Sequence, residues 1–417
     1  MVKFLHTADL HLDTPFTGLQ KIDGQRAQIL KDANHKVFSN IVSLAIREEV
    51  DFVVIAGDIF DGRIRSLNAR LTFSRGLTQL HQHGIWVYAA CGNHDPMSVW
   101  DHSLKKQENL VLFSAEEPES LIHHNTSGEA IAEITGMSHK TEEVSENLAA
   151  LFPRGNSGLP SIAVLHGNLT GESGHDPYAP FSMEDLKKAG QDYWALGHVH
   201  KSKILREARP AAVYSGNPQG RDFGEAGEKG CYLVTLDNQT APEITFRPTM
   251  EVLFEKKTVD ISGTEDWESF YDVMLKELEA FNPSVTTYLR LILKGRTELH
   301  THLINGPLLE EVSQELEQQM PYEGLFLDKL EVNTATAIDP ETIEHQNDFT
   351  GALFQRLRQL ETNEDPWAEM EKQLRADMKV EVRENGFPSK FGEDEKHEII
   401  EKARWLLYEK LQESAGK

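Results

Sequence analysis

Short apolar runs alternate with longer stretches of helical periodicity along the first two hundred residues. Five runs are rich in β-branched and aromatic side chains, and we predict them to be buried strands: residues 2–8, 51–57, 85–91, 161–165 and 192–197. Between the first three runs, residues 24–49 place apolar side chains four residues apart, and residues 66–83 repeat this arrangement. Strand–helix–strand alternation predicts parallel β units with helices outside the sheet.

The pattern changes after the fifth run. Residues 212–216, 231–237 and 243–248 read as strands joined by turns rich in Gly, Asp and Asn, so we predict that they complete a second, mostly antiparallel sheet. For residues 1–250 we therefore expect an α/β fold in which two packed sheets form a β-sandwich flanked by helices.

Residues 251–340 are predicted to form a second, smaller α/β domain. Their pattern alternates between strands at 251–261, 285–294 and 324–332 and helices at 264–281 and 307–319. The residues themselves indicate only that a separate fold unit is present.

Residues 341–417 are predicted to be helical and highly charged. Their apolar residues form two stripes, one through Phe349, Leu353, Leu357 and Leu360 and the other through Ile400, Ala403, Leu407 and Leu411. The helices are therefore expected either to pack back on their own domain or to dock onto a partner.

Each of the five predicted strands ends in residue types that bind metals. The segments are Asp9-Leu10-His11, Gly57-Asp58, Gly92-Asn93-His94-Asp95, Leu165-His166-Gly167-Asn168 and Gly197-His198-Val199-His200. A single D-x-H or H-x-H arises by chance in a chain with 18 histidines and has an ordinary structural interpretation. The ordered series, with every member following a strand, is a much more specific signal. It predicts a site for two metals at the strand ends.

These residue types suit the hydrolysis of a phosphodiester. Two divalent ions about 3.5–4 Å apart activate water at neutral pH and supply positive charge where oxyanion charge develops. Asp58 is the natural bridge, because the two oxygens of a carboxylate can bind both ions. Mixed nitrogen and oxygen ligands suit Mn, Fe or Zn better than Mg, and we expect Mn. His94 then offers a proton donor beside Asn93, and Asp95 is expected to orient its ring.

Other residues near these motifs leave two interpretations open. Asp13, Asp61 and His139 either contribute to the site or are surface or core residues, and His6 inside the first strand is expected to be structural. Basic residues beside the motifs either make the cleft locally positive or belong to ordinary solvated loops; they are Arg63, Arg65, Lys201, Lys203 and Arg206.

The motifs TADLHLD, AGDIFD, GNHD, LHGN and GHVH together resemble the calcineurin-like metallophosphoesterases, and within them the SbcD-type DNA repair exonucleases. HTADLHLDTPF, ITGMSH and YSGNPQGRDFGE (214–225) are most similar to the YhaO-like branch. The resemblance implies two metal sites, one held by Asp9, His11, Asp58 and His200 and the other by Asp58, Asn93, His166 and His198, with His94 as catalytic acid. In one departure, Asp61 stands where several family nucleases have a histidine.

The resemblance also implies a function and partners. It implies a metal-dependent phosphodiesterase that acts on DNA, as an exonuclease or endonuclease in repair. It also implies that residues 251–340 form a capping domain and that residues 341–417 bind an SbcC-like coiled-coil ATPase. One alternative is the same site acting on a cyclic nucleotide or another small phosphoester. A second is a scaffold of a repair complex that is catalytically weak, although every ligand is present in the chain.

Charge and cysteine content limit the partners and the compartment. With 67 acidic and 42 basic residues, the net charge of −25 argues against a broad basic surface that binds duplex DNA by counterion release. Cys91 and Cys231 are isolated, which excludes a disulfide framework and favours a reducing compartment. No signal-peptide pattern and no apolar run of about 18 residues is present. We expect a cytoplasmic protein without a membrane segment, with a homodimer as one option for its assembly.

Overall fold

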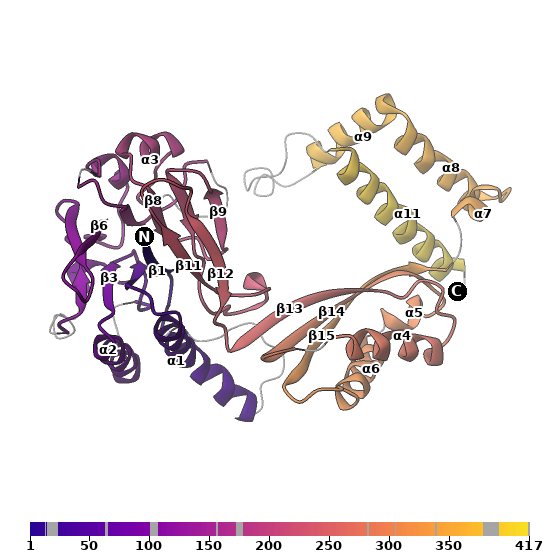
Figure 1. Cartoon of the computed structure of the whole chain (residues 1–417). Coiled ribbons are helices and arrows are strands. Elements are labelled where there is room, and N and C mark those ends of the chain that lie inside the picture. Colours follow the sequence, from indigo (N-terminus) through magenta and orange to yellow (C-terminus); the bar gives the residue numbers. More distant parts are fainter. Residues whose placement is uncertain are drawn as a thin grey trace. The chain divides into compact units, whose positions relative to one another are not determined.

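The computed structural model describes residues 1–417 except 13, 15–23, 63–65, 101–106, 156, 172–177, 282, 305, 338–339, 378–391 and 416–417. Its contacts divide the chain into two compact units (Figure 1). Unit 1 is Met1–Lys257, Asn282–Arg290 and Met320–Lys329, and unit 2 is Thr258–Phe281, Leu291–Gln319 and Leu330–Lys417. The division cuts across three long strands, and the domain boundaries predicted after residues 250 and 340 stay predictions.

The first sheet of unit 1 contains the first three predicted strands. Its order is β12-β11-β1-β2-β3-β4, with β1 (Val2–Thr7), β2 (Phe52–Ala56), β3 (Trp86–Ala90), β4 (Leu110–Leu112), β11 (Gly230–Leu236) and β12 (Glu243–Pro248). Strands β1 to β4 are parallel, and β11 and β12 are antiparallel additions. Helices α1 (Gly24–Arg47) and α2 (Leu67–Gln82) cover the outer face, where Phe38, Ile41, Phe73 and Leu77 pack on the strands. The predicted parallel units with outer helices are confirmed.

The second sheet has a parallel centre and antiparallel edges. Its order is β5-β6-β7-β8-β10-β9, with β5 (Glu119–His124), β6 (Ala130–Met137), β7 (Ser161–His166), β8 (Tyr193–Gly197), β9 (Lys203–Arg206) and β10 (Ala211–Tyr214). The outer face packs against α3 (Met183–Ala189) and the short helix η3 (Leu148–Leu151). Unit 1 is therefore the two-sheet sandwich flanked by helices that the sequence predicted.

One sheet assignment was wrong. Residues 212–248 do not complete one antiparallel sheet, because β10 joins the second sheet whereas β11 pairs with β1 and extends the first. Both faces of β11 are buried: Cys231 and Leu233 join the core beneath α1 and α2, and Tyr232 and Val234 face the second sheet. A strand covered on both faces fits beside β1, and local strand patterns carry no information about this pairing.

The core between the sheets tapers toward the carboxyl ends of the parallel strands. Inward-facing side chains run from Phe4 to Ala8 along β1 and from Phe52 to Ala56 along β2. On β8, Tyr193 is followed by Ala195 and then by Gly197. A Cβ atom at position 197 would lie 1.8 Å from the carbonyl oxygen of Ala56, so only glycine allows this approach. The two sheets therefore approach each other closely at the edge where the predicted ligands lie.

The chain after residue 250 contains the predicted elements. A three-stranded sheet has the order β13 (Val252–Asp260), β14 (Thr286–Thr297) and β15 (Leu325–Thr336), accompanied by α4 (Trp267–Glu279), α5 (His300–Leu303) and α6 (Gly306–Gln318). The remaining helices are α7 (Pro340–Glu344), α8 (Phe349–Thr362), α9 (Glu364–Asp377) and α11 (Glu393–Ala415) (Figure 1). Among the described residues, no helix is long and apolar enough to span a membrane.

The C-terminal helices bury part of their apolar stripes against one another. Leu357 and Leu360 of α8 pack with Trp367 of α9 and Ile400 of α11. Phe349, the first residue of α8, is 70% exposed, and Leu407 of the α11 stripe is 37% exposed. Leu406, which lies beside that stripe, is 56% exposed. The stripes thus have two parts, one covered within the segment and one open.

Candidate metal centre

The predicted ligands lie on loops with an unusual backbone. Six non-glycine residues in the described part of the chain have positive φ, and four of them are predicted ligands: Asp9 (φ 52°), His11 (43°), Asp58 (51°) and His198 (98°). Such conformations cost on the order of 1–3 kcal/mol each and persist only where the surroundings impose them. Here Asp9 N–H donates to Gly57 O at 3.0 Å, and His11 N–H donates to Asp58 O at 3.1 Å. The loops after β1 and β2 therefore hold each other in this form.

One group of potential ligands gathers around His11 and His200. Their Nε2 atoms are 3.1 Å apart, and donor atoms of Asp9, His11 and His200 all lie within 4.8 Å of one another. The other ring nitrogen of His200, Nδ1, donates to Glu225 Oε1 at 2.7 Å. The Nε2 lone pair of His200 consequently points toward His11, as it would toward a shared cation.

A second group surrounds Asn93. Its Oδ1 lies 2.9 Å from His166 Nε2 and 3.2 Å from His198 Nδ1. His166 Nδ1 donates to Ala56 O at 2.9 Å, which leaves Nε2 as the nitrogen that can bind a metal. Asp58 Oδ2 lies 3.3 Å from His166 Nε2 and 3.9 Å from His11 Nε2. Asp58 therefore stands between the two groups, as a bridging ligand must.

The electrostatics of these groups favour bound cations. Asp9, Asp58 and His166 are almost fully buried. Burial raises the pKa of Asp9 and lowers the pKa of His11 to about 3. Although burial alone would lower the pKa of His166, the carboxylates of Asp58 and Asp9 raise it to about 9. The buried carboxylates thus attract positive charge, which either a proton on His166 or a cation can supply. A metal would bind the neutral form of each imidazole. The residues fit a dinuclear centre.

Asp61 is the carboxylate that the structure places on the ring of His94. Asp61 Oδ1 is 2.6 Å from His94 Nδ1, and Asp61 Oδ2 accepts a hydrogen bond of 2.5 Å from Thr14 Oγ1. The bond to Asp61 raises the pKa of His94, and the bond from His94 lowers the pKa of Asp61. We predicted that Asp95 would orient this ring. The structure gives that position to Asp61, because both carboxylate oxygens of Asp95 accept hydrogen bonds from backbone N–H groups.

Asp95 supports the loops instead. Its Oδ1 accepts a hydrogen bond from Gly92 N–H at 2.9 Å, and its Oδ2 accepts from Ile59 N–H at 2.9 Å and Phe60 N–H at 3.2 Å. These groups belong to the loops that carry Asn93 and Asp58. Asp95 therefore fixes two ligand loops relative to each other from beneath the site.

The remaining histidines of the sequence analysis are support residues. His139 is buried, and its Nε2 donates to His166 O at 2.8 Å, so it holds the backbone of a potential ligand. His6 is buried beside Tyr193, whose hydroxyl lies 3.0 Å from His6 Nδ1, which agrees with its expected structural role. Asp13, Arg63 and Arg65 lie outside the described residues.

The sequence did not reveal the residues that hold the ring of His200 in place. Arg221 Nη2 donates to Glu225 Oε1 at 2.7 Å, and Asn217 Nδ2 donates to Glu225 Oε2 at 2.8 Å. Although burial opposes it, the hydrogen bonds from His200 and Arg221 lower the pKa of Glu225, so this carboxylate stays charged. Arg221 and Glu225 lie in the segment YSGNPQGRDFGE, where a pair of opposite charges four residues apart was the available signal.

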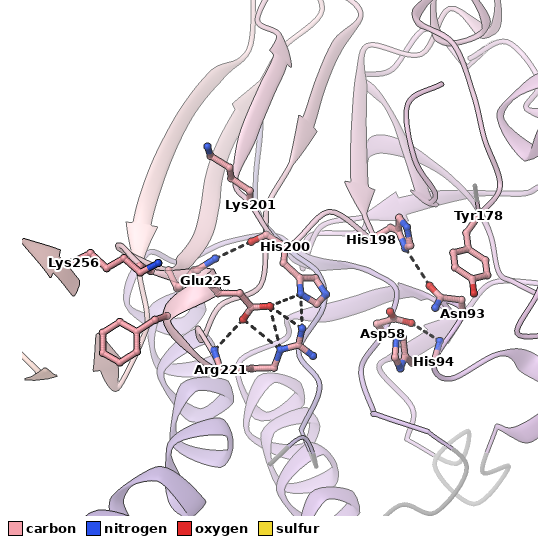
Figure 2. A pocket seen from close by; sticks show the side chains of 14 residues that line it. Asp58, Asn93, His94, Tyr178, His198, His200, Lys201, Arg221, Glu225 and Lys256 are labelled. Atoms are coloured by element: carbon pink, nitrogen blue, oxygen red, sulfur yellow. Dashed lines mark hydrogen bonds and ion pairs between the residues drawn. The ribbon is translucent and has the colours of Figure 1, made fainter. Parts of the chain in front are cut away.

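A cavity of about 760 Å³ opens beside these residues (Figure 2). It is lined by Asp58, Asn93, His94, Tyr178, His198, His200, Lys201, Arg221, Phe223, Gly224, Glu225, Ala226, Lys229 and Lys256. All of them belong to unit 1. Of the basic residues singled out beside the motifs, Lys201 lines this cavity.

Comparison with known proteins agrees with this geometry. Residues 2–202 match the calcineurin-like phosphoesterase family, and residues 254–335 match the middle domain of metallophosphoesterase YhaO. The chain is 34% identical over 357 residues to the uncharacterized metallophosphoesterase YhaO of Bacillus subtilis, which covers 85% of this chain and 86% of that one.

Two relatives with other names are more distant. A subunit of the nuclease SbcCD of Escherichia coli is 26% identical over 57% of this chain and 66% of its own length. The DNA double-strand break repair protein Mre11 of Methanocaldococcus jannaschii is 25% identical over 82% of this chain and 84% of its own length.

Glu225 should contribute to metal affinity through His200. Residues that orient a metal-binding histidine typically change affinity by about 10–100-fold when they are replaced. We expect Glu225→Gln to weaken Mn²⁺ binding by about that factor, measured by calorimetric titration of chelator-treated protein. Glu228→Gln removes an exposed carboxylate three residues further along the chain and serves as control. Equal affinities of the two variants would contradict the assignment.

Proposed function

The chain belongs to the calcineurin-like metallophosphoesterase family, and from this premise we propose that it is a two-metal phosphodiesterase that acts on DNA. The observation that carries the proposal is the position of Asp58 between two groups of ligands. A site of this kind serves phosphoester hydrolysis in general. DNA as the substrate is the finer part of the proposal and rests on further observations.

We assign one metal ion to Asp9, His11, Asp58 and His200 and the other to Asp58, Asn93, His166 and His198. Two divalent ions held there would supply an activated water and stabilise the negative charge that develops during phosphodiester hydrolysis. The mixture of imidazole nitrogens and carboxylate and amide oxygens is compatible with Mn, Fe or Zn, and of these we propose Mn. The backbone hydrogen bonds of the loops keep these ligands oriented, as do the hydrogen bonds that His200 donates to Glu225 and His166 donates to Ala56 O.

His94 is proposed as the catalytic acid. Its side chain is 42% exposed and lines the cavity, so it can reach a bound substrate. Asp61 holds Nδ1 and favours the charged form of the ring, which leaves the Nε2–H to donate to the leaving oxygen. Thr14 holds Asp61 in turn. Asp61 thus takes the place that a histidine has in several family nucleases.

DNA is favoured as substrate by the relatives and by the cavity. The E. coli relative is named as part of a nuclease, and the M. jannaschii relative as a DNA repair protein. Lys201, Arg221, Lys229 and Lys256 line the cavity, which makes it locally basic in a chain with a net charge of −25. The cavity volume of about 760 Å³ would also hold a cyclic nucleotide or another small phosphoester, which is the second candidate.

The C-terminal helices are proposed to bind an SbcC-like ATPase. The name of the E. coli relative describes it as one subunit of the nuclease SbcCD. Phe349 and Leu406 remain largely exposed on α8 and α11 although their neighbours pack against each other. Exposed apolar side chains of this size fit a contact with a partner protein.

The function can be tested by restoring metal to chelator-treated protein. With Mn²⁺ we expect the wild type to hydrolyse both linear DNA and the phosphodiester dye bis(p-nitrophenyl) phosphate. Asp58→Ala should lose both activities together with both ions. His11→Ala should chiefly lose one ion, as measured by elemental analysis. Hydrolysis of the dye alone would favour the small phosphoester. Full metal content without hydrolysis would favour the scaffold, and full metal content in Asp58→Ala would refute the bridge.

His94 should affect turnover and not metal content. A general acid contributes about 10²–10⁴-fold in rate, so His94→Ala should lower kcat on the dye by that factor while both ions stay bound. Asp61→Asn should cause a smaller loss of about 10–100-fold, because it acts through His94. The exposed His124 provides a control, since His124→Ala should leave kcat unchanged. Unchanged turnover in His94→Ala would exclude the role.

The partner can be tested in the full-length chain. Phe349→Glu and Leu406→Glu place a charge on exposed positions, so the fold should tolerate them. We expect both variants to hydrolyse the dye normally but to lose co-purification with the co-expressed ATPase. Leu151→Glu is the matched control, because Leu151 is 55% exposed in unit 1. Retained co-purification by both variants would argue against this surface.

A further inference from the structure

The basic residues of the cavity lie to one side of the metal ligands. Figure 2 shows Lys201 and Lys256 on the far side of His200 from Asp58 and His94. Lys201 follows the H-x-H segment after β8, and Lys256 lies on β13. Two elements far apart in the sequence thus bring ammonium groups to the same cavity, next to the reaction centre.

The four cations of the cavity differ in what they already bind. Lys229 is 7% exposed, and its Nζ donates to His200 O at 3.0 Å. Arg221 is committed to Glu225, with Nη2 to Oε1 at 2.7 Å. Lys201 and Lys256 are exposed, and in the part of the chain that the structure describes neither ammonium has an ion pair. These two lysines are therefore available to a ligand.

The carboxylates of the cavity do not neutralise these lysines. Asp58 faces His166 and His11, and Glu225 is held by His200 and Arg221. The charge on Lys201 and Lys256 is therefore left to attract an anion, in a protein whose net charge is −25. A concave wall with one sign of charge concentrates the opposite charge of a ligand.

We propose that Lys201 and Lys256 form a second phosphate subsite, which binds a backbone phosphate adjacent to the scissile one in DNA. This inference rests on the proposed function, because it requires a phosphodiester chain whose cleaved phosphate lies at the metal ligands. Lysine binds phosphate as a point charge on a flexible stem, which suits a backbone of changing conformation. The subsite would favour a polynucleotide over a substrate with a single phosphate.

The test compares two substrates that differ in the number of phosphates. Bis(p-nitrophenyl) phosphate has one phosphate and cannot use the subsite, whereas a short oligothymidylate has several. We expect Lys201→Ala and Lys256→Ala each to lower kcat/KM on the oligothymidylate by about 10-fold, chiefly through KM. The dye should be hydrolysed at the wild-type rate. Each substitution should also reduce the slope of log kcat/KM against log salt by about 0.7.

Neighbouring lysines provide matched controls. Lys203 and Lys257 are close in sequence to Lys201 and Lys256 but do not line the cavity. Lys203→Ala and Lys257→Ala should therefore leave kcat/KM unchanged on both substrates. A parallel loss on the dye and the oligothymidylate, or an equal effect of the controls, would overturn the subsite. If the wild type cleaves the oligothymidylate and the variants match it, only the subsite fails. If the wild type hydrolyses the dye alone, the proposed DNA substrate fails as well.

Discussion

The close approach of the two sheets at the carboxyl ends of their strands is the constraint on which the metal centre depends. Three potential ligand loops follow strands of the first sheet and two follow strands of the second, so neither sheet can build the site alone. Small residues make the approach possible. A Cβ atom at Gly197 would meet Ala56 O at 1.8 Å, and one at Gly57 would meet His166 Nδ1 at 2.2 Å. A side chain at either position would push apart the two groups of proposed ligands on either side of Asp58.

This arrangement is unfavourable by itself and is stabilised by its surroundings. Four of the proposed ligands have left-handed backbone conformations, and both Asp9 and Asp58 are buried. The cost of these conformations and buried charges is offset by the hydrophobic cores on the two faces of the first sheet. Hydrogen bonds to Asp95 and Glu225, which hold the ligand loops and His200 in place, offset it further. Bound cations would remove the remaining repulsion between the carboxylates, so metal binding and stability of the loops are coupled.

The sequence was sufficient for the strands and for the ligand types, because both have local signatures. A buried strand followed by D-x-H or H-x-H can be recognised from adjacent residues, and the structure brings all seven potential ligands together. The contacts behind the ligands have no such signature. Asp95 stands next to His94 in the chain, yet Asp61 from another loop reaches its ring. The pairing of β11 with β1 likewise joins segments about 230 residues apart, which local patterns cannot reveal.

That last pairing has a consequence for how the protein is made. During synthesis, β1 emerges first and can pair with β2 after about fifty residues, but its other edge stays open until β11 leaves the ribosome. An open strand edge is a template for wrong pairing with other chains. The first sheet therefore becomes complete only after β11 and β12 have been translated, and until then one edge of β1 has no partner strand.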